Sequence, residues 1–149
     1  MSNLYLRKAE LSDIDLYYEW ANDPIVRSNS FNTEHIPYEE HVNWFNRVFQ
    51  RDDVVLFVLM EDDMAVGQIR INITDAVAEI SYSISSEFRG KGYGGIIVSL
   101  LIERIKEDLP GIKTVCARVK PNNVASLKVF EREGFAKKEV VFELDLKNK

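Results

Sequence analysis

The sequence predicts a single domain of mixed α/β (α+β) type, in which helices flank one β-sheet. The chain has 149 residues, of which 46% are hydrophobic and 29% charged, a length and balance typical of one globular domain. Short apolar or alternating runs, which predict strands, are interleaved with segments of helical periodicity. No repeat, low-complexity stretch or linker interrupts residues 1–149.

The first third of the chain predicts one strand and two helices. Residues 4–9 alternate and predict the first strand. Ser12 can cap a helix whose apolar residues recur at helical spacing, and Asn22-Asp23-Pro24 is expected to end it. A polar stretch, residues 27–33, is expected to be irregular, and residues 38–49 predict the second helix.

The rest of the chain alternates between the two kinds of element. Three strands are expected before a glycine-rich segment, and a helix, a strand, a second helix and final β structure after it. The predicted strands are 54–60, 65–74, 78–85, 114–119 and 135–146, and the predicted helices contain residues 96–105 and 123–133. The resulting order, β-α-α-β-β-β-α-β-α-β, indicates a mixed sheet.

The strongest local signal is the glycine-rich segment between strand 78–85 and the helix after it. Four of the chain's seven glycines lie within residues 90–95. Glycines let successive N–H groups point into one concavity, and a helix start adds its positive dipole end, so the segment suits a pyrophosphate. The alternative is a glycine-rich connector. The segment reads GxGxGG, so it matches neither the Rossmann pattern nor the P-loop.

Two blocks of the sequence resemble the GNAT N-acetyltransferase superfamily. Residues 89–94, Arg-Gly-Lys-Gly-Tyr-Gly, match its Q/R-x-x-G-x-G/A acetyl-CoA signature, and residues 123–135 resemble its second block, an asparagine and a helix before Gly-Phe. The resemblance implies a mostly antiparallel sheet with one splayed parallel pair, strands 79–85 and 114–119, and acetyl-CoA between them. It also implies direct attack of a primary amine on the thioester.

The resemblance further implies which residues hold acetyl-CoA. Backbone near residues 83–85 would pair with the pantetheine arm, amides of residues 91–95 would hold the pyrophosphate, and Asn123 would contact the linkage between them. The cofactor-binding candidates are Ser83, Ile84, Ser85, Arg89, Gly90, Lys91, Gly92, Tyr93, Gly94, Gly95, Asn123 and Phe130.

Glu79 is the candidate general base, because family members place a glutamate in this strand and an attacking amine must be neutral. Its face also carries Ser81 and Ser83, which indicates a wet cavity or simply a solvated face. The sequence does not identify the general acid that would protonate the thiolate. Phe130 stands where many relatives have a tyrosine, and Tyr93, Tyr82 or water could replace it, or the thiolate could leave unprotonated.

The acceptor is expected at the N-terminal half. Residues 20–27 and 39–45 resemble GNAT enzymes that acetylate the 4-amino group of UDP-linked amino sugars, as in pseudaminic acid synthesis. Arg27 could pair with phosphate, Asn22 and Asn29 could bond hydroxyls, and Phe31 or Trp44 could stack on uracil. Each of these residues also has a purely structural interpretation. His41 is expected to be a surface residue of its helix rather than a base.

Two alternatives to the sugar acceptor remain. One is acetylation of a protein N-terminus or a polyamine; a polycation site should be acidic, whereas residues 22–32 carry Arg27 and asparagines. The other belongs to a different class: a CoA-binding sensor without turnover, suggested by the missing tyrosine at Phe130.

The composition of the chain limits the kinds of binding partner and the cellular compartment that we expect. The net charge is −5, which argues against nucleic acid and against a polybasic membrane contact. No apolar run approaches a membrane span, and no secretory signal is visible. The single cysteine, Cys116, excludes a disulfide framework, and no spacing suggests a metal. A cytoplasmic protein is expected, with a possible homodimer through residues 135–146.

Overall fold

A five-stranded sheet with the strand order β1-β2-β3-β4-β5 forms the centre of the computed structural model, which describes residues 2–148. The strands are β1 (Leu4–Lys8), β2 (Val54–Glu61), β3 (Met64–Thr74), β4 (Val77–Ile84) and β5 (Thr114–Cys116). Neighbouring strands are antiparallel, except that β4 and β5 run parallel. The mixed, mostly antiparallel sheet expected from the sequence is confirmed.

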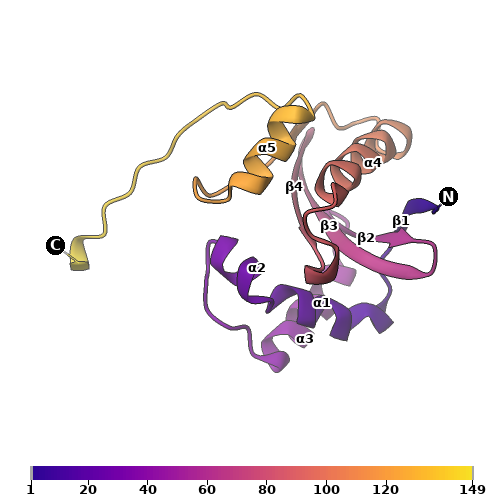
Figure 1. Cartoon of the computed structure of the whole chain (residues 1–149), viewed down its shortest axis with the longest axis horizontal. Helices are drawn as coiled ribbons and strands as arrows, with labels where there is room; N and C mark the ends of the chain where they lie inside the picture. Colours follow the sequence, from indigo (N-terminus) through magenta and orange to yellow (C-terminus); the bar gives the residue numbers. More distant parts are fainter. Residues whose placement is uncertain (1, 149) are drawn as a thin grey trace.

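Helices cover both faces of this sheet (Figure 1). One face carries α1 (Ile14–Ala21), α2 (Pro24–Asn29) and α3 (Tyr38–Phe49), and the other carries α4 (Tyr93–Asp108) and α5 (Val124–Arg132). Short 3₁₀ turns occupy Leu11–Asp13, Ser86–Phe88 and Leu146–Asn148.

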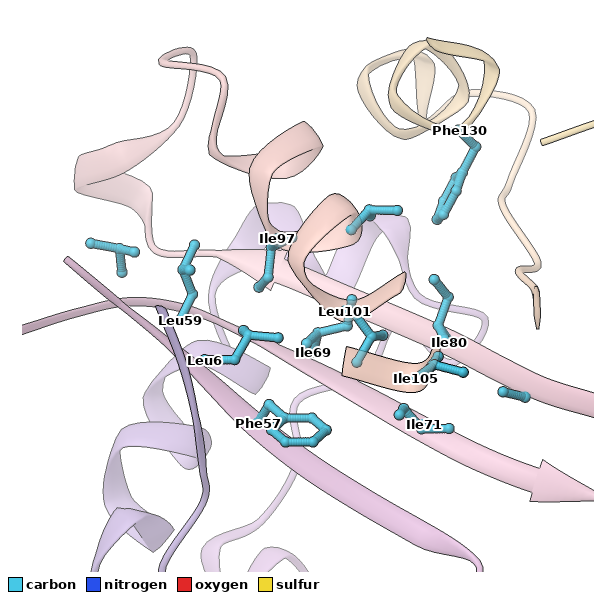
Figure 2. Packing of buried hydrophobic residues seen from close by; sticks show 13 residues of the cluster. Leu6, Phe57, Leu59, Ile69, Ile71, Ile80, Ile97, Leu101, Ile105 and Phe130 are labelled. Carbon is cyan, nitrogen blue, oxygen red and sulfur yellow. The ribbon is translucent and has the colours of Figure 1, made fainter. Parts of the chain in front are cut away.

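Two apolar clusters join these layers. In the larger one, Ile69 and Ile71 of β3 pack beneath Ile97 and Leu101 of α4 (Figure 2). The smaller one packs side chains of α1 and α3, among them the fully buried Phe45, against β2. Burying one such side chain contributes roughly 1.5–3 kcal/mol. Because the smaller cluster is centred on β2, the same face of β3 and β4 is left to polar side chains.

Helix α2 corrects the expectation for residues 27–29, which are helical, whereas residues 30–33 are irregular as expected. Asp23 accepts hydrogen bonds from the N–H groups of Ile25 (2.9 Å) and Val26 (3.3 Å), and Pro24 occupies the first turn. An aspartate cap followed by proline is a strong helix start. The Asn-Asp-Pro segment therefore ends α1, as predicted, and also begins a helix that the sequence interpretation missed.

The final β structure predicted for residues 135–146 is wrong. Residues 135–145 contain no strand, and the chain leaves the body after α5 as an extended tail (Figure 1). Phe135 still packs on Phe130, but the apolar side chains from Val140 onward are exposed, Phe142 by 91%. The alternation is strand-like, but a strand needs a neighbour to pair with. For the same reason β5 ends at Cys116 rather than at residue 119.

No helix within residues 2–148 combines the length and the apolar character needed to cross a membrane.

Candidate functional site

A cleft of about 1060 Å³ runs from the loops around α2 and α3 to the gap between β4 and β5. Its floor is the polar face of β3 and β4. The predicted residues that line it are Arg27, Asn29, Phe31, Trp44, Glu79, Ser83, Ile84, Arg89, Gly90, Gly92, Tyr93, Gly94, Asn123 and Phe130. Asn22, Ser85 and Lys91 do not line it. Gly95 lies in a small neighbouring hollow with Glu133.

The two parallel strands separate along the cleft. Their pairing ends at Glu79 and Cys116, while β4 continues to Ile84. Within residues 2–148, no strand pairs with this outer edge of β4 beyond Glu79. Ala117 and Val119 line the opposite side of the opening. Apart from the Ile84 carbonyl, which accepts from Arg89 Nε, the N–H and C=O groups on this edge of β4 can therefore bond an extended ligand as an added strand would.

The glycine loop presents the start of α4 to the cleft. Gly90 and Gly92 have φ angles of +76° and +88°, a left-handed conformation that favours glycine. Helix α4 begins directly after Gly92, so its first N–H groups lack intrahelical acceptors and carry the positive end of the helix dipole. A Cβ on Gly94 would lie 3.2 Å from both Tyr82 Oη and Val129 Cγ2. The loop fits an anionic group such as a diphosphate.

Arg89 is committed to the protein rather than free for a ligand. Its Nε donates to the Ile84 carbonyl at 3.1 Å, and its Nη2 pairs with Asp23 Oδ1 at 3.0 Å. Partial burial opposes the charge of Asp23, but bonds from Arg89 and from two backbone N–H groups outweigh it and lower the pKa of Asp23. Arg89 thus ties the glycine loop to the start of α2. Lys91 Nζ lies 5.7 Å from the centre of the Phe88 ring, outside the cleft.

Helix α5 forms the wall opposite β4. Asn123 caps it, since its Oδ1 accepts from the Ser126 N–H at 3.3 Å. The Asn123 Nδ2 has no partner within the described residues. Phe130, 8% exposed, packs on the Tyr82 ring with centroids 5.9 Å apart. Tyr82 Oη lies 3.2 Å from Ser126 Oγ, and burial raises the pKa of Tyr82.

The other candidate hydroxyl, that of Tyr93, is engaged elsewhere. It donates to Glu61 Oε1 at 2.7 Å. Glu79, by contrast, keeps its side chain 45% exposed at the floor of the cleft, with Oε1 3.4 Å from Arg118 Nη2. A half-exposed carboxylate at this place can take a proton from a bound amine or from an intervening water.

The loop around α2 is held by its own polar side chains. Arg27 donates to the carbonyls of Ala21 (2.7 Å), Asn32 (3.0 Å) and Glu34 (3.2 Å), and to Ser30 Oγ (3.2 Å). Its guanidinium therefore shapes the loop, and the phosphate contact expected of it stays a prediction.

Two further side chains tie α1 to the chain that follows it. Asn22 exchanges two hydrogen bonds with the backbone of Ile36 (3.0 and 2.8 Å), so its amide is committed to the protein. His41 is 2% exposed, its Nε2 lies 2.8 Å from the Ile14 carbonyl, and burial lowers its pKa. The expectation of a surface histidine is wrong, because α1 covers this side of α3.

Phe31 and Trp44 form an aromatic rim. Phe31 is 71% exposed and Trp44 is half-buried, and both line the cleft. These positions are compatible with stacking on a flat ring. No group of three or more His, Cys, Asp or Glu side chains suited to a metal ion occurs in the described part of the chain.

Sequence reasoning missed Arg70, which lies on the cleft floor. Its guanidinium is 5.8 Å from the centre of the Trp44 ring, and desolvation lowers its pKa. The available signal was its place between two apolar strand residues, Ile69 and Ile71. That alternation puts Arg70 on the opposite face of β3, but only the tertiary structure shows what lies there.

Comparisons with known proteins agree with this geometry. A family model described as acetyltransferase (GNAT) domain matches residues 3–136. The uncharacterized protein MJ1062 of Methanocaldococcus jannaschii is 28% identical over 91% of the chain, which spans only 28% of that protein's length. Acetyltransferase PseH of Campylobacter jejuni is 27% identical over 85% of the chain and 80% of its own length. The structure of AAC(6')-Ib with ribostamycin and coenzyme A shares the fold, with a TM-score of 0.83 and 20% identity over 93% of this chain and 86% of that one.

Proposed function

The chain belongs to the GNAT acetyltransferase family, whose acetyl donor is acetyl-CoA, and we propose that it acetylates the 4-amino group of a UDP-linked amino sugar. One observation carries this proposal: a single cleft of about 1060 Å³ joins the gap between β4 and β5 to an aromatic rim. That volume is at the upper end of single-ligand sites, so it suits a cofactor end together with a bulky acceptor. The similarity to PseH and the resemblance of residues 20–27 and 39–45 to nucleotide-sugar enzymes support the same acceptor.

Acetyl-CoA is proposed to lie along the free edge of β4. The N–H groups at the start of α4, after Gly92, would receive the diphosphate. The backbone of residues 80–84 would bond the pantetheine amides, and the unpartnered Asn123 Nδ2 would donate to the same arm. When bound, acetyl-CoA supplies an acetyl group already activated as a thioester. The protein then contributes orientation and proton transfer.

Glu79 is proposed to take the proton of the acceptor amine. Its exposed carboxylate faces the cleft near the point where β4 and β5 part. The neutral amine attacks the thioester carbonyl carbon, its N–C bond forms, and the C–S bond breaks to release the thiolate of CoA. The nitrogen loses its remaining extra proton to solvent, which leaves the neutral amide. No covalent bond to the protein is needed.

We propose that the departing thiolate takes its proton from solvent. Phe130 has no proton to give, and the Tyr93 hydroxyl is bonded to Glu61. Tyr82 lies nearby, but burial raises its pKa above its ordinary value of 10.0. A thiol has an ordinary pKa of about 8.5, so transfer from Tyr82 to the thiolate is uphill.

The test is a thiol-release assay with acetyl-CoA and three acceptors: a UDP-linked 4-amino sugar, a peptide N-terminus and spermidine, with products identified by mass spectrometry. Acetylation of the UDP-sugar alone is the expected result. Release of CoA with only the peptide or spermidine would rule out the UDP-linked amino sugar as the acceptor. Tight acetyl-CoA binding without release on any amine would favour a CoA-binding sensor.

A further inference from the structure

We propose that Arg70 is the anion receptor of the acceptor site, binding a phosphate or carboxylate of the amine substrate and so selecting acceptors that carry negative charge. The inference rests on the proposed acetyl transfer, and it assigns the acceptor's charged group to a residue of the cleft floor.

Strand register places Arg70 at the centre of the floor. It pairs with Leu56 of β2 on one side and with Ser81 of β4 on the other. Its side chain lies on the face of β3 that also carries Gln68, whose Nε2 donates to Ser83 Oγ at 3.0 Å. Arg70 is therefore between the apolar cluster on β2 and the polar row of β4, on the acceptor side of the sheet.

Arg70 is half-buried, and within residues 2–148 its guanidinium has neither a hydrogen-bond acceptor nor an ion-pair partner. The guanidinium lies over the Trp44 ring. Glu79 attracts it electrostatically, but the Glu79 carboxylate is ion-paired with Arg118. Arg70 lines the cleft, and its N–H donors have only water to bond; partial burial weakens that hydration, and a bound anion would satisfy the donors.

The other arginines that line the cleft differ in this respect. Arg27 is saturated by four oxygen atoms of its own loop, Arg89 is paired with Asp23, and Arg118 with Glu79. Arg47 is exposed at the edge, where water solvates its charge. Among the described cleft arginines, Arg70 is the one that is half-buried and has no hydrogen-bond acceptor or ion-pair partner in the protein. A planar guanidinium matches phosphate and carboxylate in bidentate fashion, and partial burial strengthens that interaction.

The test compares matched acceptors in the full chain. Two carry an anion, a UDP-linked 4-amino sugar and glutamate, and two are their neutral counterparts, the methyl glycoside of the sugar and glutamate diethyl ester. Kinetics are measured for the wild type, Arg70→Gln, Arg70→Lys and, as the control for loss of one cleft charge, Arg47→Gln. Binding of UDP and of N-acetylglutamate to the CoA-loaded protein is measured in parallel, so that absence of turnover still leaves a readout.

We expect Arg70→Gln to raise KM or Kd for an anionic ligand about 10- to 100-fold, the range for loss of a charged hydrogen-bonded pair. Neutral acceptors and the KM for acetyl-CoA should change less than about 2-fold, and Arg70→Lys should fall between. An effect on UDP ligands identifies phosphate as the anionic group that Arg70 binds. An effect on glutamate ligands alone identifies carboxylate; the UDP-sugar proposal then fails while the role of Arg70 stands. Equal losses for neutral and anionic ligands, no loss for either anion, or the same loss in Arg47→Gln would overturn the inference.

Discussion

The two ends of the cleft are built in different ways. The end proposed for acetyl-CoA is mostly backbone from one stretch of chain, residues 80–95, where an open strand edge leads into a glycine turn and a helix start. The end proposed for the acceptor consists of side chains that come from three separate segments, among them Phe31, Trp44 and Arg70. A backbone site leaves a contiguous trace in the sequence. A site made of distant side chains does not.

Glu79 lies where the two ends meet, and its replacement has the largest expected effect. Glu79→Gln removes the proposed base but keeps the side chain's shape, so kcat should fall about 10²- to 10⁴-fold. The KM values for both substrates should stay within about 3-fold, as measured by thiol release. Glu87→Gln, in the exposed turn before the glycine loop, is the control. An unchanged kcat would remove Glu79 from the mechanism.

Gly92→Val tests whether the acetyl-CoA end depends on backbone conformation. The left-handed conformation of Gly92 costs another residue roughly 1–2 kcal/mol, and a distorted loop should raise the KM for acetyl-CoA about 10-fold while sparing the KM for the acceptor. The matched control is Gly111→Val, since Gly111 has no left-handed φ and no atom within 4 Å of an added Cβ. If both variants raised the KM for acetyl-CoA equally, the left-handed backbone of Gly92 would not be what this end of the cleft depends on.

Arg27→Lys tests whether the acceptor loop is held by its own side chains. Lysine cannot reproduce the four bonds of the guanidinium, so the free energy of unfolding should fall by about 1–3 kcal/mol. Thermal or denaturant unfolding measures this, with Arg47→Lys as control. A stable variant whose KM for an anionic acceptor rises would instead make Arg27 the phosphate ligand that the sequence suggests.

The ion pair between Asp23 and Arg89 makes the free energy of unfolding depend on pH. The pKa of Asp23 is lowered in the folded state, so its stabilising contribution is present above the ordinary pKa of 3.8 and is lost as pH falls through the lowered value. Asparagine caps a helix as well as aspartate does, so Asp23→Asn removes the charge and keeps the cap. The unfolding free energies of wild type and variant should converge below about pH 4, from a difference of about 1 kcal/mol or less at neutral pH.

Tyr82→Phe has the smallest expected effect. If the thiolate is protonated by solvent, kcat should stay within about 3-fold of the wild type, because the variant loses only the bond to Ser126. A fall of 100-fold with unchanged thermal stability would show that Tyr82 donates the proton.

The contrast also explains what the sequence could and could not predict. The helix at 38–49 was placed correctly, because its apolar periodicity is local. The glycine loop is likewise a local signal, since its four glycines lie within residues 90–95. Arg27 was chosen from charge and position alone, whereas its bonding depends on how residues 21–34 fold. Arg70 was missed because its surroundings come from α3, β2 and β4. The β structure expected at residues 135–146 is wrong, because the local sequence does not report whether a strand would find a pairing partner.

The ion pair between Arg89 and Asp23 has one more consequence. It joins the loop beside the proposed acetyl-CoA site to the N-cap of α2, the helix beside the proposed acceptor site. If ordering either segment favours the paired geometry, the two substrates become energetically linked through it. Any factor by which bound acetyl-CoA tightens the acceptor must then equal the factor by which bound acceptor tightens acetyl-CoA. The cleft would then favour joint occupancy over either substrate alone.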